Sequence, residues 1–104
     1  MNKAHLEAEA VKWIPEHMIG ALSRYVFDGL QPGSFLEAVL CNDLRRAVER
    51  ADEKNRDNLP NWIMLLYNYV PAACWGSPDK YRQWVEIGGY NGVLKMQQED
   101  RNDA

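Results

Sequence analysis

Residues 32–51, Pro-Gly-Ser-Phe-Leu-Glu-Ala-Val-Leu-Cys-Asn-Asp-Leu-Arg-Arg-Ala-Val-Glu-Arg-Ala, contain the clearest helix start in the chain. The opening proline and glycine are turn-forming residues that lead the chain into Ser34. Ser34 and Glu37 have the spacing of a capping box, in which each side chain satisfies a free amide at the helix N-terminus. The pattern predicts a helix over about 34–52. Asp43 would then lie within its apolar face.

Three further segments carry helix start or stop signals. After Pro15, apolar residues recur at steps of three and four, which is the spacing of one helix face, and proline is favoured in a first helical turn. Gly29 follows this pattern at the position where a left-handed residue ends many helices. Asp57 or Asn58 can cap the next segment, and Ser77 the last. We therefore expect helices over about 15–28, 59–70 and 78–87.

No stretch sustains the period-two alternation of a half-buried strand, so strands are not expected. The sequence predicts an all-α fold, a compact bundle of about four helices. Residues 14–89 would form the helical domain. Residues 1–13 would be a variable N-terminal extension, and residues 90–104 a loose acidic C-terminal tail.

Length and charge limit the classes of function. A chain of 104 residues forms one domain. The formal net charge of −3 argues against a nucleic-acid polymer as partner, since such binding uses clustered Lys and Arg. The N-terminus lacks the apolar core of a signal peptide, and no apolar run is long enough to span a bilayer. We expect a soluble protein of the cytoplasm, with Cys41 and Cys74 as free thiols rather than a disulfide.

Asp43 is the most unusual polar residue of the predicted 34–52 helix. At about 100° per residue it falls between Leu36 and Leu40, and Arg46 follows on the flank of the same stripe. An unpaired carboxylate there would cost several kcal/mol, so Asp43 needs a cation or several donors. Two interpretations are open. In the structural one, Asp43 pairs with Arg46 or caps the amides of a neighbouring helix. In the functional one, Asp43 and Arg46 line a polar pocket together with Asn42. In the pocket, Arg46 would engage an anionic group and Asp43 would orient it.

Other features are compatible with a ligand site. Gly33-Ser34 and Gly76-Ser77 each precede a helix N-terminus, where free amides attract phosphate or carboxylate. The aromatic side chains near the second start could stack on a base, although core packing or a subunit interface explains them better. They are Tyr67, Tyr69, Trp75, Tyr81 and Trp84. The candidate ligand-binding residues are Arg24, Ser34, Asn42, Asp43, Arg46, Tyr67, Asn68, Trp75 and Ser77.

Nothing in the sequence indicates an enzyme. His17 is a lone histidine on a polar helix face, without a Ser, Cys or second His placed to form a triad. No Walker loop, dinucleotide fingerprint or metal cluster occurs. We therefore expect no catalytic residue, no metal site and no cofactor.

Three phrases, "PEHMIGALSRYVFDGLQPGS", "FLEAVLCNDLRRAVERAD" and "LYNYVPAACWGSPDKYRQW", resemble a family of small uncharacterised proteins of tailed bacteriophages and prophages. The similarity covers roughly residues 14–89, and a PGSFLxAVLxNDL-type motif is its most specific part. The family brings no assigned chemistry. What the resemblance implies is a phage accessory protein that works in the host bacterial cytoplasm.

Two hypotheses of different class follow from that setting. The first is a non-enzymatic counter-defence factor, a sponge protein that sequesters a nucleotide immune signal of the cyclic oligonucleotide or cyclic ADP-ribose type. The second is a protein-interaction inhibitor of a host defence enzyme, as anti-CRISPR proteins are; a regulator of phage development is a third. Because the predicted 59–70 helix is apolar nearly all round, we also expect a homo-oligomer.

Overall fold

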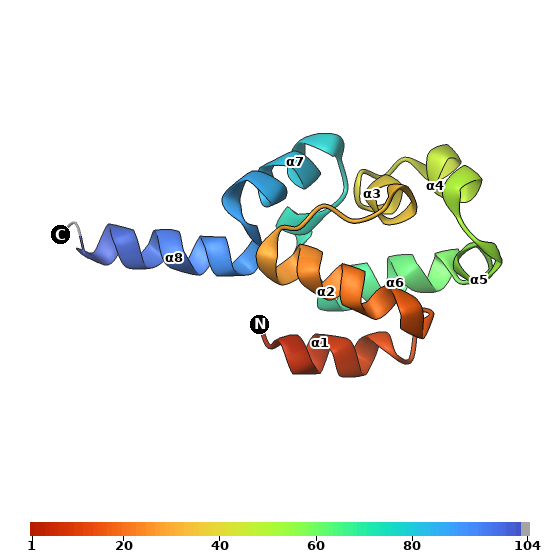
Figure 1. Ribbon diagram of the computed structural model, residues 1–104, viewed down its shortest axis with the longest axis horizontal. Coiled ribbons are helices and arrows are strands. Elements are labelled where there is room, and N and C mark those ends of the chain that lie inside the picture. The colour runs from red at the N-terminus through yellow and green to blue at the C-terminus, as the bar shows by residue number, and fades with distance from the viewer. Residues whose placement is uncertain (103–104) are drawn as a thin grey trace.

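The computed structural model describes residues 1–102, and the side chains of residues 1–100. All regular structure in this range is helical (Figure 1). The elements in chain order are α1 (Lys3–Ala10), η1 (Glu16–Met18), α2 (Ile19–Asp28), α3 (Ser34–Leu40), α4 (Leu44–Arg50), α5 (Glu53–Asp57), α6 (Leu59–Tyr69), η2 (Ala72–Cys74), α7 (Pro78–Ile87) and α8 (Gly89–Asn102), where η marks a 3₁₀ helix. The predicted all-α class is confirmed. The prediction of about four helices is wrong, since eight α-helices form over residues 1–102.

The core is built mainly from α2, α3 and α6. Its largest fully buried side chains include Trp62, Tyr25 and Leu36. The N-terminal helix α1 runs beneath α2 in Figure 1 and buries Leu6 and Ala10 against this core. Residues predicted to be an extension of the domain thus contribute to its packing.

Most of the polar atoms on buried aromatic side chains form hydrogen bonds, as burial requires. Trp62 Nε1 donates to Asn55 Oδ1 at 3.1 Å, and Trp84 Nε1 donates to the Val26 carbonyl at 3.1 Å. The Tyr25 hydroxyl donates to the Cys74 carbonyl at 2.6 Å. These bonds fix α5 to α6, α7 to α2, and α2 to the segment after α6.

The predicted 34–52 helix is wrong, because the chain breaks it into α3 and α4. Asn42 adopts a left-handed conformation with φ of 61°, which Asn tolerates better than most residues. The predicted capping box is also wrong. Gly33 is the N-cap residue of α3 and Ser34 its first residue, with no side-chain cap. Asp43, predicted inside the helix, instead caps the start of α4.

Helix boundaries with strong local signals are confirmed. The predicted 78–87 helix is α7, and the Ser77 hydroxyl accepts from the Lys80 amide at 3.2 Å. The predicted 59–70 helix is α6, with proline in its first turn. Gly29 has φ of 67° at the end of α2, as expected. Two details differ. A 3₁₀ turn replaces the first helical turn before α2, and Asn58 at the N-cap of α6 makes no side-chain cap.

The predicted loose tail is helical up to Asn102, and its residues 103–104 lie outside the described residues. Gly88 and Gly89 both have positive φ, 85° and 68°, which turns the chain from α7 into α8. The base of α8 packs on the end of α2, where Asn91 Nδ2 donates to Asp28 Oδ1 at 2.9 Å and Tyr90 meets Phe27 edge-on. Beyond residue 93 the side chains are exposed up to residue 100, and α8 extends away from the body (Figure 1).

Candidate functional site

A groove lies between the end of α3, the start of α4 and the first turns of α7. Its volume is about 270 Å³. It is lined by Glu37, Cys41, Asp43, Arg46, Pro78, Tyr81 and Arg82. A backbone bond holds its sides together, because the Gly76 amide donates to the Leu40 carbonyl at 2.8 Å. Two segments far apart in the sequence thus form one polar surface.

The turn between α3 and α4 sets the positions of Asp43 and Arg46. Asp43 Oδ1 accepts from the backbone amide of Arg46 at 3.2 Å, which is the capping interaction left open by the sequence. The Arg46 guanidinium lies 3.7 Å from Glu37 Oε1 instead. Both side chains of that pair are partly exposed, at 38% for Arg46 and 33% for Glu37. The pair is therefore weak, and Arg46 can exchange its partner for another anion.

Replacing Asp43 with Ala removes the cap of α4. We expect the D43A substitution to lower the free energy of unfolding by about 1 kcal/mol. Asp43→Asn should lose much less, because an Asn side chain also accepts from the amide. Chemical denaturation of the three proteins measures this. Equal losses for D43A and D43N would mean that the negative charge matters rather than the cap.

Tyr81 places a buried polar atom at the groove. Its side chain is 9% exposed, and its ring stacks on Tyr25 with centroids 5.5 Å apart. Its hydroxyl has no hydrogen-bond partner within the described part of the chain. An unsatisfied buried hydroxyl is costly, so it marks a place where a partner is expected. Ser23 Oγ and Trp13 Nε1 are also unpartnered there, but neither residue lines the groove.

Charged and titratable groups lie close to Tyr81. Burial is the main cause of the raised pKa of Tyr81. The charges of Glu37 and Cys41 raise this pKa further, and the charge of Arg46 lowers it. All three of these residues line the groove. Burial likewise raises the pKa of the Cys41 thiol, so this cysteine is not an activated nucleophile. The residues that line the groove thus include hydrogen-bond donors and carboxylates.

The groove collects some of the nine predicted ligand-binding residues. Asp43 and Arg46 line it, Asn42 forms the turn beside them, and Ser77 caps the helix that supplies its other wall. The other five lie elsewhere. Arg24 folds back over Gly20 on its own helix, and Ser34 is exposed at the start of α3. Tyr67 and Asn68 are exposed on α6, and Trp75 is half-buried before α7.

Sequence reasoning missed five lining residues as ligand contacts. These are Glu37, Cys41, Pro78, Tyr81 and Arg82. Glu37 and Tyr81 had been given other roles, in a helix cap and in an aromatic cluster. Arg82 carries no local signal, because its place beside Arg46 depends on how α7 packs on α3.

A second feature is an apolar surface over α4 and α6, which we call the α4–α6 face. It consists of five exposed side chains: Leu44, Val48, Ile63, Met64 and Tyr67. Leu44 and Ile63 line a common cavity of about 30 Å³, so the two helices meet there. Helix α6 has no charged residue. Exposed apolar surface without charge is typical of a protein–protein interface.

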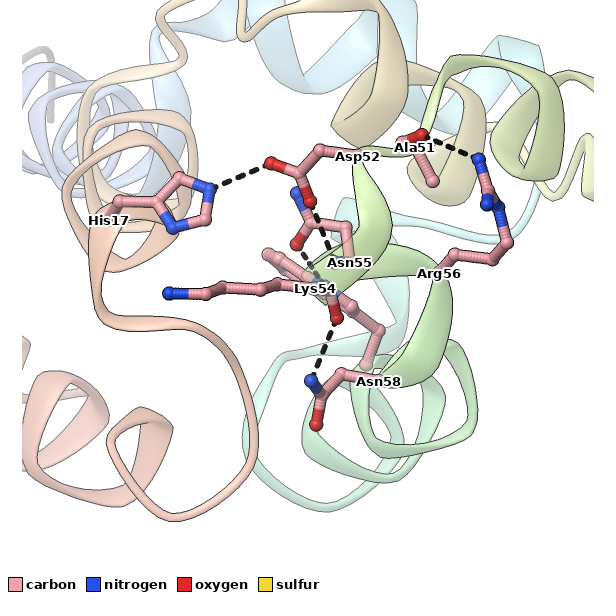
Figure 2. Close-up of polar contacts among 8 residues, drawn as sticks. His17, Ala51, Asp52, Lys54, Asn55, Arg56 and Asn58 are labelled. Atoms are coloured by element: carbon pink, nitrogen blue, oxygen red, sulfur yellow. Dashed lines mark hydrogen bonds and ion pairs between the residues drawn. The ribbon is translucent and has the colours of Figure 1, made fainter.

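His17 belongs to a structural cluster rather than to the groove (Figure 2). Its Nε2 lies 3.1 Å from Asp52 Oδ2, and Asp52 Oδ1 accepts from the Asn55 amide at 2.8 Å as the cap of α5. The hydrogen bond from the Asn55 amide is the main reason why the pKa of Asp52 is lowered. His17 lowers this pKa further, and desolvation partly opposes the shift. Both side chains of the pair are about half exposed. The cluster links η1, the 3₁₀ turn before α2, to the N-cap of α5.

Across residues 1–102, no group of three or more His, Cys, Asp or Glu side chains could hold a metal ion. No helix in that range is long and apolar enough to cross a membrane. Comparison with protein-family models, with curated proteins and with solved structures finds no match to this chain.

Proposed function

We propose that the protein is a non-enzymatic binding protein that sequesters a small nucleotide ligand in the α3–α4–α7 groove. One observation carries this proposal: Tyr81, whose buried hydroxyl has no partner among the side chains of residues 1–100, lines a groove that Arg46 and Arg82 also line. Arginine and hydroxyl donors together suit phosphate oxygens. The resemblance to phage proteins supplies the setting, in which the ligand is a nucleotide immune signal of the host.

The size of the groove limits how much ligand it can hold. Pockets for drug-sized ligands have about 300–1,000 Å³, and the groove has about 270 Å³. It suits one nucleotide unit. A cyclic oligonucleotide or cyclic ADP-ribose derivative would therefore place one nucleotide unit in the groove, with the rest outside.

Aromatic stacking contributes less than the sequence suggested. Tyr81 already stacks on Tyr25, and Trp84 donates its indole N–H to the Val26 carbonyl within the core. Tyr67 is 76% exposed, but it belongs to the α4–α6 face. Recognition in the groove would thus rest on charge and hydrogen bonds.

The proposal is tested by thermal unfolding with a panel of cyclic di- and trinucleotides and cyclic ADP-ribose isomers. A ligand at 100 times its Kd adds about 2.7 kcal/mol to the stability of the folded protein. Arg46→Ala should abolish the shift. Arg45→Ala is the matched control, because Arg45 is the adjacent cation but is 91% exposed and bonds Glu49. No shift with any member of the panel, or equal loss in both variants, would overturn the proposal.

The α4–α6 face favours a second candidate function, in which the protein inhibits a host defence enzyme by docking on it. The same face is the proposed contact of a homo-oligomer. Arg45 and Glu49 flank it with one charge of each sign, so a two-fold-related copy could pair them reciprocally. Sedimentation of the purified protein distinguishes these uses. A dimer that Ile63→Asp dissociates supports self-association, and a monomer that co-purifies with a host enzyme supports the inhibitor.

A further inference from the structure

We infer that the groove selects a singly charged phosphate diester over a doubly charged phosphate monoester. This inference rests on the proposed function and names its ligand class more closely. The ligand would be a nucleotide whose phosphate is closed into a diester, with N–H or O–H donors nearby. The argument comes from the charges that line the groove.

The charges of the groove nearly cancel. Arg46 and Arg82 contribute two positive charges, and Glu37 and Asp43 contribute two negative ones. Asp79, next to the groove on α7, lies 3.2 Å from Arg82 Nη1 and adds a further carboxylate. With Asp79 counted, these five groups sum to −1, so together they oppose each negative charge that a phosphate brings. A doubly charged phosphate is therefore opposed more strongly than a singly charged one, while the two guanidinium groups are the cationic donors available to either.

The hydroxyl of Tyr81 gives the phosphate a fixed position. It is buried, held by stacking on Tyr25, and has no partner among the side chains of residues 1–100. Glu37 and Arg46 line the same groove and form a pair that spans 3.7 Å, so a ligand that binds Arg46 must part this pair. A partly exposed pair of this kind contributes little to stability, so parting it costs little. Arg46 would then contact the phosphate from one side and Tyr81 from below.

The carboxylates have a role once that pair has parted. Glu37 becomes free to accept hydrogen bonds, and a carboxylate accepts but cannot donate. Guanine offers N–H donors of the type it requires. A nucleotide diester carries both an anion for the arginines and donors for Glu37, whereas inorganic phosphate carries no such donors.

The test compares 3′,5′-cyclic GMP with 5′-GMP by isothermal titration calorimetry at pH 8, where the second phosphate charge of 5′-GMP is present because its pKa is about 6. We expect cyclic GMP to bind at least about tenfold more tightly than 5′-GMP. A tenfold difference in Kd is about 1.4 kcal/mol, which is the size of one or two unfavourable charge contacts at partly exposed sites. Tyr81→Phe keeps the stacked ring but removes the donor, and it should weaken cyclic GMP binding about tenfold.

A charge-neutralising variant tests whether the Glu37 carboxylate opposes the second phosphate charge. Glu37→Gln should narrow the preference for the diester about three- to fivefold, because one repelling charge is removed. Glu49→Gln, which changes the same charge on the outer side of α4, should leave the preference unchanged.

Lowering the pH towards 6 provides an independent arm. It should strengthen binding of 5′-GMP, whose phosphate gains a proton, and leave cyclic GMP unaffected. The groups that face the phosphate are Glu37 and Cys41 of the α3 end, Asp43 and Arg46 of the α4 start, and Asp79, Tyr81 and Arg82 of α7. The raised pKa values of Cys41 and Tyr81 keep both uncharged across this range.

The outcomes separate the two proposals. If both nucleotides bind and 5′-GMP binds equally well or better at pH 8, the charge argument is wrong while the binding function stands. If neither binds and the cyclic oligonucleotides also fail, both are wrong. If Tyr81→Phe binds cyclic GMP as the original chain does, Tyr81 is not the phosphate contact and the inference falls.

Discussion

Gly89→Ala is expected to destabilise the protein strongly. Gly89 has φ of 68°, and a Cβ there would lie 2.5 Å from the backbone nitrogen of Gly29 and 2.7 Å from that of Asp28. These are backbone atoms that cannot move aside as a side chain can. The strain of a left-handed alanine adds to this overlap. We expect the free energy of unfolding to fall by about 3 kcal/mol or more.

Gly88→Ala is the matched control for this prediction. Gly88 also has positive φ, at 85°, but a Cβ there would meet only Gly92 Cα at an ordinary 3.7 Å. It should therefore cost only the backbone strain, about 1 kcal/mol. Urea unfolding of both variants measures the difference. Equal losses would mean that the contact between Gly29 and Gly89 does not hold α8 on α2.

Trp62→Ala should produce the largest loss in the core. The Trp62 side chain is fully buried, meets Phe35 edge-on at 5.8 Å, and donates its indole N–H to Asn55. Truncating a buried aromatic ring to alanine costs about 3–5 kcal/mol. Asn55, itself buried, would also lose its hydrogen-bond partner, which places the expected loss at the upper end of that range.

Tyr67→Ala is the control for Trp62, because it removes an aromatic ring from the same helix. Tyr67 is 76% exposed, so its removal should change the stability of a monomer by no more than about 0.5 kcal/mol. Thermal and urea unfolding at low protein concentration measure both variants. A loss for Tyr67→Ala as large as for Trp62→Ala would place the core on the other face of α6.

Local sequence signals predicted the helices that begin with a strong cap. The start of α7 depends on Ser77 and the proline after it, and both act within one turn of the helix. The α3–α4 break was predictable in principle from Asn42-Asp43, since Asn accepts left-handed φ and Asp is a good N-cap. The apolar periodicity that continues across both residues concealed it.

Features that depend on distant contacts could not be predicted from the sequence. The helical state of residues 89–102 depends on Gly89 meeting Gly29, a pairing that no local pattern contains. The groove depends on the bond from Gly76 to Leu40, which brings Tyr81 and Arg82 to the α3 end. Sequence reasoning therefore identified Asp43 and Arg46 on one wall of the groove but not the side chains that face them.

The most direct measurement is a titration of the ¹⁵N-labelled protein with 3′,5′-cyclic GMP, followed by amide chemical shifts. Binding in the groove predicts that the shifts change in two separate segments, residues 37–46 and residues 77–82, with one common dissociation constant. Changes confined to residues 59–69, or no change with millimolar cyclic GMP and none with the cyclic oligonucleotides, would contradict the assignment of the groove as the binding site.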